Sequence, residues 1–131
     1  MTDLLIIDDD TDLCYLITQI LEPYQLNISS TPSLTEAEQY IRGTKVRTVL
    51  LDHHVADGAA LDFIATIHQI DQTINVLVTS NSMSRVFEQQ ALAKGATLFL
   101  PKPFNYQQVL ELGLLAGDKK KTSEEAESYS S

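Results

Sequence analysis

The sequence predicts an α/β protein in which an open, doubly wound parallel sheet of five strands is covered by five helices. Short apolar runs alternate with longer segments whose apolar residues recur at helical spacing, which is the pattern of repeated strand–helix units. The chain of 131 residues is 44% hydrophobic and 21% charged, as expected for one globular domain that buries a core. Polar residues follow most of the apolar runs directly, where proteins of this class bind ligands.

The predicted strands are short apolar segments bounded by polar residues. Leu4–Ile7 is the clearest, because a strand that is covered on both faces has an uninterrupted apolar sequence, and Val46–Leu51 is the next clearest. Pro101 follows the last strand and lacks a backbone donor, which a sheet tolerates best at an edge. The predicted strands are Leu4–Ile7, Asn27–Ser30, Val46–Leu51, Ile74–Val78 and Thr97–Leu100.

Helical spacing and capping sequences define the helices between these strands. The first helix has an apolar stripe and is ended by Pro23. Two other helices begin with a Ser or Asn that precedes a Glu or Gln by three residues, which is the pattern of a capping box. The stripe consists of Leu13, Ile17, Ile20 and Leu21, and the capping sequences are Ser33–Glu36 and Asn105–Gln108. The second helix is predicted to end at Gly43 and the third to span Ala60–Ile70. The fourth helix is predicted to span Ser84–Lys94 and to end before Gly95, and the last helix is predicted to end at Ala116.

Residues 1–117 are expected to form the domain, and residues 118–131, which are polar and charged, a flexible tail. No apolar run approaches the roughly 20 residues of a membrane-spanning helix, and acidic residues rather than a cleavage site follow Leu4–Ile7. The single cysteine, Cys14, excludes an internal disulfide and lies on the apolar stripe, so we interpret it as a core residue. These features predict a cytoplasmic protein without a membrane partner.

The chain is acidic, with a formal net charge of −9. Nucleic-acid binding requires a basic face that neutralises phosphates. The basic run Lys119–Lys121 is flanked by acidic residues, Asp118 before it and Glu124 and Glu125 after it. The charge therefore argues against direct binding to nucleic acid.

The candidate site lies at the carboxyl ends of the predicted strands. Asp8 and Asp9 follow the first strand, Asp52 follows the third, Thr79 the fourth, and Lys102 the fifth. Because the carboxyl ends of parallel strands meet at one edge of a sheet, we expect these side chains to converge.

The converging charges are consistent with a magnesium site. Carboxylates about 4 Å apart repel by roughly 4 kcal/mol at an effective dielectric constant near 20. One Mg²⁺ and the ammonium group of Lys102 would balance the three carboxylates, and Mg²⁺ prefers oxygen ligands. Lys102 and the Thr79 hydroxyl could then hold phosphoryl oxygens, which leaves Asp52 as the nucleophile that forms an acyl phosphate.

Each residue also has a simpler interpretation when it is considered alone. Asp8–Asp10 could be acidic residues that favour a helix N-terminus. Asp52 could cap a helix, Thr79 could be an ordinary strand residue, and Lys102 could be a solvated surface charge. The prediction therefore depends on their joint placement.

Four segments resemble the motifs of two-component response-regulator receiver domains, the CheY-like family. They are Leu5-Ile6-Ile7-Asp8-Asp9-Asp10, Val49-Leu50-Leu51-Asp52, Val76-Leu77-Val78-Thr79-Ser80 and Lys102-Pro103-Phe104. The resemblance covers roughly residues 4–116, with the motifs in the family's order. It implies the flavodoxin-like strand order 2-1-3-4-5.

The resemblance also implies roles for individual residues. Asp52 would be phosphorylated by a histidine kinase or a histidine phosphotransfer protein. Asp9, Asp52 and the backbone carbonyl of His54 would ligate Mg²⁺, for which Mn²⁺ can substitute, and Asp8 would act directly or through water. Thr79 would move toward the phosphoryl group.

The resemblance further implies a switch that other proteins can detect. Phe99 would turn inward, the Lys102–Pro103 peptide bond would be cis, and the face of the fourth helix, fifth strand and fifth helix would bind an output protein. Such a domain receives a phosphoryl group and can release it, but it is not a classical turnover enzyme.

The sequence departs from the family pattern at several positions. Ala56 occupies a position at which many members have proline, and Ala60 occupies one at which they have glycine. Both differences affect the expected backbone geometry of the loop after Asp52. Phe99 lacks the hydroxyl group of the more common tyrosine. Leu98 and the segment 113–116 lack the charges through which DNA-binding members often dimerise, so we do not predict that dimer.

Two other functions remain open. A haloacid-dehalogenase type of enzyme would use Asp8 as its nucleophile, but Asp12 does not fit that motif. A receiver-like interaction module could act without phosphorylation, an alternative that Ala56 keeps open. His53 and His54 are interpreted as lone surface histidines rather than ligands of a transition metal, because neighbours in a loop rarely point at one ion.

Overall fold

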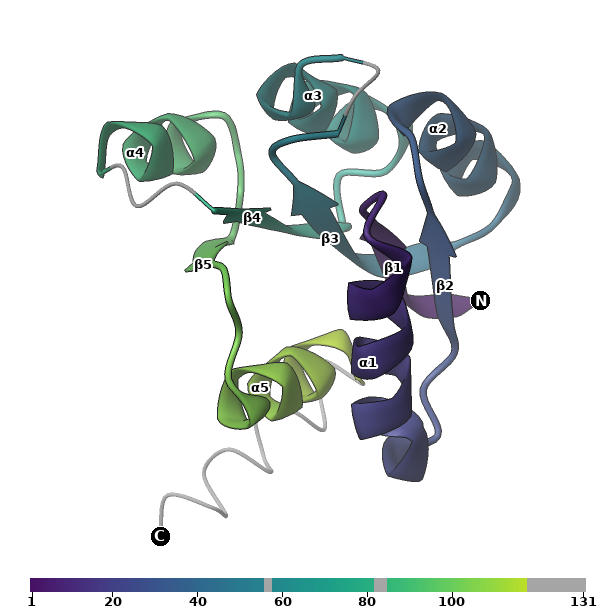
Figure 1. Cartoon of the computed structure of the whole chain (residues 1–131). Coiled ribbons are helices and arrows are strands. Elements are labelled where there is room, and N and C mark those ends of the chain that lie inside the picture. Colours follow the sequence, from purple (N-terminus) through teal and green to yellow (C-terminus); the bar gives the residue numbers. More distant parts are fainter. Residues whose placement is uncertain (56–57, 82–84, 118–131) are drawn as a thin grey trace, which may run out of the picture.

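The computed structural model describes residues 1–55, 58–81 and 85–117, and it contains a five-stranded parallel sheet in the order β2-β1-β3-β4-β5 (Figure 1). The predicted fold class and strand order are therefore confirmed. Ala56, Ser84 and the predicted tail 118–131 lie outside the described residues. The strands are β1 Thr2–Ile7, β2 Ile28–Thr31, β3 Val46–Asp52, β4 Asn75–Ser80 and β5 Leu98–Pro101.

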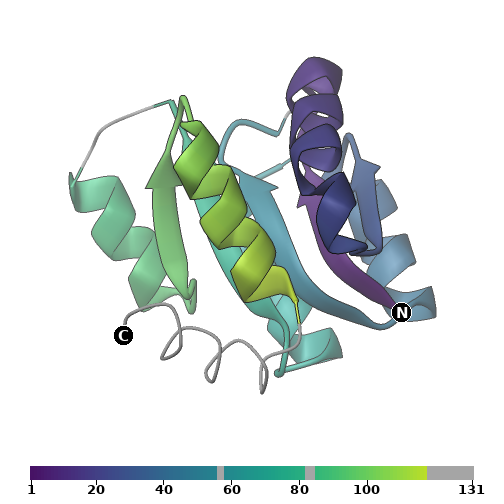
Figure 2. The same ribbon diagram turned by 90° about the horizontal axis from the view of Figure 1, so that it is seen from below.

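Five helices cover both faces of the sheet. They are α1 Thr11–Leu21, α2 Leu34–Gly43, α3 Ala60–Ile70, α4 Arg85–Ala93 and α5 Tyr106–Ala116. Helices α1 and α5 lie on one face, and α2, α3 and α4 lie on the other (Figure 1). Figure 2 shows α1 and α5 side by side in front of the sheet. None of the helices in the described part of the chain has the length and apolar character that a membrane span requires.

The predicted capping residues begin their helices. The Ser33 hydroxyl accepts a hydrogen bond from the backbone N–H of Glu36 at 3.2 Å. Asn105 and Gln108 form a complete capping box at the start of α5, which satisfies donors that the helix itself cannot pair. Helix α1 ends before Pro23, and a short 3₁₀ turn, η1 Glu22–Tyr24, follows. Proline is tolerated at the start of such a turn because no backbone donor is needed there.

The sheet separates two buried clusters of side chains. Alternate residues of β1 point to opposite faces, so that Leu5 and Ile7 pack beneath α2, α3 and α4, whereas Leu4 and Ile6 pack beneath α1 and α5. Both faces are covered, which explains the apolar runs Leu4–Ile7, Val49–Leu51 and Val76–Val78 in the central strands. Cys14 is buried in the second cluster, as predicted for a core residue.

Close packing of α1 against α5 depends on Gly113. A Cβ atom at this position would lie 2.5 Å from Cδ2 of Leu21, and Leu21 is fully buried. Gly113→Ala is expected to lower the free energy of unfolding by about 1 kcal/mol. Overpacking of the helix interface costs about 1–3 kcal/mol, whereas the higher helix propensity of alanine stabilises the helix by about 1 kcal/mol. Urea denaturation measures the difference. Gly43→Ala is the matched control, because a Cβ atom there meets nothing within 4 Å. Equal midpoints for the two variants would contradict the prediction.

Candidate metal and phosphoryl site

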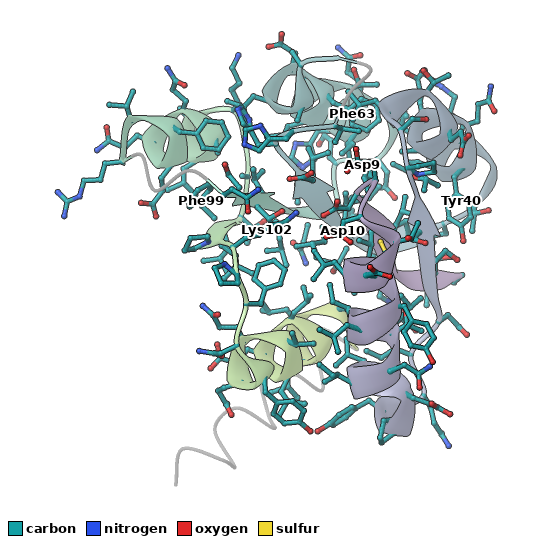
Figure 3. All side chains as sticks on the ribbon, viewed as in Figure 1. Asp9, Asp10, Tyr40, Phe63, Phe99 and Lys102 are labelled. Atoms are coloured by element: carbon teal, nitrogen blue, oxygen red, sulfur yellow. The ribbon has the colours of Figure 1, made fainter. Side chains whose placement is uncertain are left out.

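The carboxyl ends of β1 and β3 bring three aspartates together. The two strands are adjacent, with Ile7 paired to Leu51, so the residues that follow them meet at one edge of the sheet. One carboxylate oxygen from each of Asp8, Asp9 and Asp52 lies within 4.8 Å of the other two. Asp8 and Asp52 are only 5% and 4% exposed, whereas Asp9 is exposed. Figure 3 shows Asp9 at the tip of the loop after β1, above the sheet edge.

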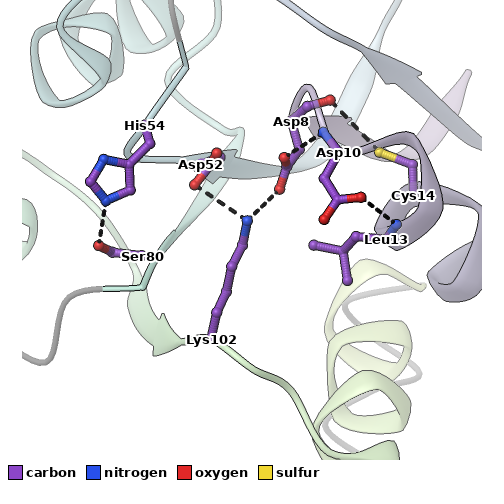
Figure 4. Close-up of polar contacts among 8 residues, drawn as sticks. All are labelled: Asp8, Asp10, Leu13, Cys14, Asp52, His54, Ser80 and Lys102. Carbon is purple, nitrogen blue, oxygen red and sulfur yellow. Dashed lines mark hydrogen bonds and ion pairs between the residues drawn. The ribbon is translucent and has the colours of Figure 1, made fainter.

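Lys102 points into this group of carboxylates from the end of β5 (Figure 4). Its Nζ atom lies 2.8 Å from Oδ2 of Asp8 and 3.5 Å from Oδ1 of Asp52. Burial alone would lower the pKa of Lys102, but the hydrogen bond and charge of Asp8, together with the charge of Asp52, raise it above its ordinary value. The side chain is therefore a fixed positive charge. The peptide bond that follows it, Lys102–Pro103, is cis, as the family resemblance implied.

Asp52 is a buried carboxylate in an unfavourable electrostatic environment. Burial raises its pKa, and the neighbouring charge of Asp8 raises it further, while Lys102 and the backbone N–H of His54 act in the opposite direction. Its Oδ1 atom is buried and accepts no hydrogen bond, although the Lys102 ammonium group is 3.5 Å away. An unsatisfied buried carboxylate oxygen is costly, and a bound cation would satisfy it.

The three consecutive aspartates after β1 have different structural roles. The Asp10 side chain caps α1 by accepting a hydrogen bond from the backbone N–H of Leu13 at 3.1 Å. Asp8 accepts a hydrogen bond from the backbone N–H of Asp10 at 3.0 Å, which fixes the loop between them (Figure 4). Asp8 and Asp9 therefore belong to the cluster, and Asp10 belongs to the helix.

Strand β4 contributes hydroxyl groups at the same edge. Thr79 is paired with Asp52 in the β3–β4 register and is 1% exposed. Its carbonyl accepts a hydrogen bond from the backbone N–H of His53 at 2.8 Å, which holds the start of the loop after β3. The next residue, Ser80, has its hydroxyl 3.3 Å from Nε2 of His54 (Figure 4). The structure thus brings Asp8, Asp9, Asp52 and Lys102 together, and it places the backbone of Thr79 beside Asp52.

His53 is not the lone surface histidine that the sequence suggested. It is half-buried, and its ring lies 3.8 Å from the ring of Phe87, centroid to centroid. Phe87 in turn lies 5.5 Å from Phe99 of β5. Burial lowers the pKa of His53, and the neighbouring His54 lowers it further. The sequence signals that Phe87 is buried, because Phe87 and Ala91 share one face of a helix, but it does not indicate which rings meet there.

The donor atoms of the cluster fit a hard divalent cation. All of them are carboxylate oxygens, which suit Mg²⁺, Ca²⁺ or Mn²⁺ rather than metals that prefer nitrogen or sulfur ligands. Three carboxylates and one ammonium group leave an excess of negative charge that a dication would neutralise. Among the residues that the structure describes, this is the only cluster of three possible ligands.

Comparison with known proteins places the chain in a family. The model of the response regulator receiver domain matches residues 4–112. The transcriptional regulatory protein ZraR of Escherichia coli is 30% identical over 115 residues, which are 86% of this chain and 26% of ZraR. The phosphoglycerate transport system transcriptional regulatory protein PgtA of Salmonella typhimurium is 28% identical, over 83% of this chain and 26% of PgtA. The chain therefore spans about a quarter of the length of these curated relatives.

Solved structures agree with this assignment. The beryllofluoride-activated NtrC4 receiver domain matches with a TM-score of 0.81 and 28% identity, over 86% of this chain and 93% of that one. The receiver domain of a putative Luxo repressor protein from Vibrio parahaemolyticus also matches with a TM-score of 0.81, at 25% identity, over 94% of this chain and 93% of that one. With the family model covering most of the described residues, the chain belongs to the response regulator receiver domain family.

Proposed function

We propose that this receiver domain accepts a phosphoryl group on Asp52, next to a Mg²⁺ ion held by Asp8, Asp9 and Asp52 with the backbone carbonyl of His54. The observation that carries the proposal is the state of Asp52 itself. It is a buried carboxylate with an unsatisfied Oδ1 atom, two further carboxylates within 4.8 Å and one ammonium group at 3.5 Å. Receiver domains are signalling domains rather than classical enzymes, so the product matters as a signal.

The residues around Asp52 supply the remaining groups for phosphoryl transfer. When bound, Mg²⁺ supplies positive charge that neutralises the carboxylates and the phosphoryl oxygens. The Lys102 ammonium group holds one phosphoryl oxygen, and the Thr79 hydroxyl donates a hydrogen bond to another. An Asp52 oxygen forms the new bond to phosphorus as the phosphorus–nitrogen bond of a donor histidine breaks. The electron pair stays on the histidine nitrogen, and the product is an acyl phosphate.

The proposed partners follow from this chemistry. A histidine kinase or a histidine phosphotransfer protein supplies the phosphoryl group. The output protein binds the face formed by α4, β5 and α5, where large apolar side chains are exposed. These side chains include Val86, Leu98 and Tyr106, which are 64%, 39% and 63% exposed. Cys14 is a free thiol, which suits the reducing cytoplasm that we propose as the location.

Intact-mass measurement after incubation with acetyl phosphate and Mg²⁺ tests the proposal. The wild type should gain the mass of one phosphoryl group, and Asp52→Asn should gain none. Asp10→Asn is the matched control, because Asp10 caps α1 and asparagine also caps helices. It should be labelled like the wild type. Chelation of Mg²⁺ with EDTA should suppress labelling of both.

Other outcomes identify the alternatives. If the wild type gains no mass, the domain acts as an interaction module without phosphorylation. If Asp52→Asn still gains mass and Asp8→Asn does not, the nucleophile is Asp8, as in a haloacid-dehalogenase type of site.

A further inference from the structure

The loop that follows β3 is attached to the rest of the domain at three consecutive residues. The backbone N–H of His53 donates a hydrogen bond to the carbonyl of Thr79 at 2.8 Å. The imidazole of His54 reaches the end of β4, where its Nε2 atom lies 3.3 Å from the hydroxyl oxygen of Ser80 (Figure 4). Val55 is 4% exposed and packs into the core beneath α2, α3 and α4. The contact between His54 and Ser80 is thus a side-chain tether from the loop to the sheet.

Ser80 is the rigid end of this tether. It is the last residue of β4 and is fully buried. Its carbonyl accepts a hydrogen bond from the backbone N–H of Lys102 at 2.8 Å, which fixes the backbone that carries the hydroxyl group. His54, in contrast, is exposed, so its ring is held on the protein by contacts and not by enclosure. The tether therefore restrains His54 more than it restrains Ser80.

Both polar groups of the His54 backbone concern the Asp52 site. The N–H donates a hydrogen bond to the Asp52 carboxylate, and the carbonyl is one of the proposed ligands of Mg²⁺. The loop sequence 53–59 contains a glycine and no proline, so no ring fixes its backbone dihedral angles. The orientation of the two groups therefore depends on noncovalent contacts made by the side chains of the loop.

We propose that Ser80 is a positioning residue for the metal site: by holding the imidazole of His54, it keeps the His54 carbonyl directed at Mg²⁺. This inference rests on the proposed function of Asp52 and identifies a residue that sets the affinity of its site for the ion. Mg²⁺ requires near-ideal octahedral geometry, so a carbonyl that can turn away is a poor ligand. Ser80 acts through His54, in the way that hydrogen-bond partners behind a metal ligand orient that ligand.

Titration with Mg²⁺ followed by amide NMR, without a phosphoryl donor, measures the affinity. Ser80→Ala should weaken Mg²⁺ binding by about two- to tenfold, which is the contribution of one net hydrogen bond. His54→Leu should weaken it equally, and this variant tests the tether without disturbing the core, because His54 is exposed. The double variant should lose no more affinity than either single variant. His54→Gln should recover most of the loss, because glutamine can place a polar group where Nε2 of the ring lies.

The matched control is Ser29→Ala. The Ser29 hydroxyl accepts one side-chain hydrogen bond, from the Tyr40 hydroxyl at 2.9 Å, but it lies within the edge strand β2. This variant should bind Mg²⁺ like the wild type. If Ser80→Ala and His54→Leu bind Mg²⁺ as tightly as Ser29→Ala does, Ser80 has no positioning role. If Mg²⁺ shifts no amide near Asp52 in the wild type, the proposed metal site fails and the role of Ser80 fails with it.

Discussion

Replacing Lys102 with methionine is expected to lower the free energy of unfolding by about 2–4 kcal/mol in buffer without Mg²⁺. The substitution leaves Asp8 and Asp52 buried beside each other with no positive charge between them. Removing one partner of a buried ion pair typically costs about 3–5 kcal/mol, and we take a lower range because either carboxylate can bind a proton instead. Urea denaturation at neutral pH in EDTA measures the loss.

The control for this prediction is Lys45→Met. Lys45 is an exposed lysine at the opposite end of β3, and surface charges contribute about 0–1 kcal/mol. The raised pKa of Lys102 means that its contribution to stability is fully present below the ordinary pKa of lysine and is lost only as pH rises through the folded pKa. A loss for Lys102→Met no larger than that for Lys45→Met would contradict the ion-pair geometry.

The fold could be predicted because its signals are local and redundant. Uninterrupted apolar runs such as Leu4–Ile7 are typical of strands that are covered on both faces, and the structure covers both. The side chains of Ser33 and Asn105 begin helices through bonds to residues three positions along the chain. The ends of the strands and helices are predicted less accurately than their existence. Strand β2 begins at Ile28 rather than at the predicted Asn27, because its short, polar sequence does not mark where the strand starts.

The parts of the site that the sequence could not predict depend on contacts between distant residues. The sequence shows three consecutive aspartates, but only the structure assigns Asp10 to the cap of α1 and leaves Asp8 and Asp9 in the cluster. The burial of His53 depends on Phe87, which is more than 30 residues away in the chain. Periodicity identifies which face of a helix is buried, but not the side chain that it meets.

Asp52→Asn is expected to raise the free energy of unfolding by about 1–3 kcal/mol at neutral pH in the absence of Mg²⁺. Asparagine removes the cost of burying a charged carboxylate, which is the largest cause of the raised pKa of Asp52, and it also removes the repulsion from Asp8. A poorly paired buried group costs about 1–3 kcal/mol, and the loss of attraction to Lys102 offsets part of the gain. Urea denaturation in EDTA measures the difference. Asp12→Asn is the control, because Asp12 is exposed in the first turn of α1 and its loss should slightly destabilise the helix.

The pH dependence of this difference identifies its cause. The folded pKa of Asp52 is raised above its ordinary value, so the folded state binds the proton more tightly than the unfolded state does. Wild-type stability therefore falls as pH rises from the ordinary pKa through the folded pKa, and Asp52→Asn lacks this fall. The advantage of the variant should be fully present above the folded pKa and should vanish below the ordinary one. Mg²⁺ should stabilise the wild type more than the variant, because the variant lacks one charged ligand. An advantage that is constant with pH would show that packing, and not the buried charge of Asp52, distinguishes the two proteins.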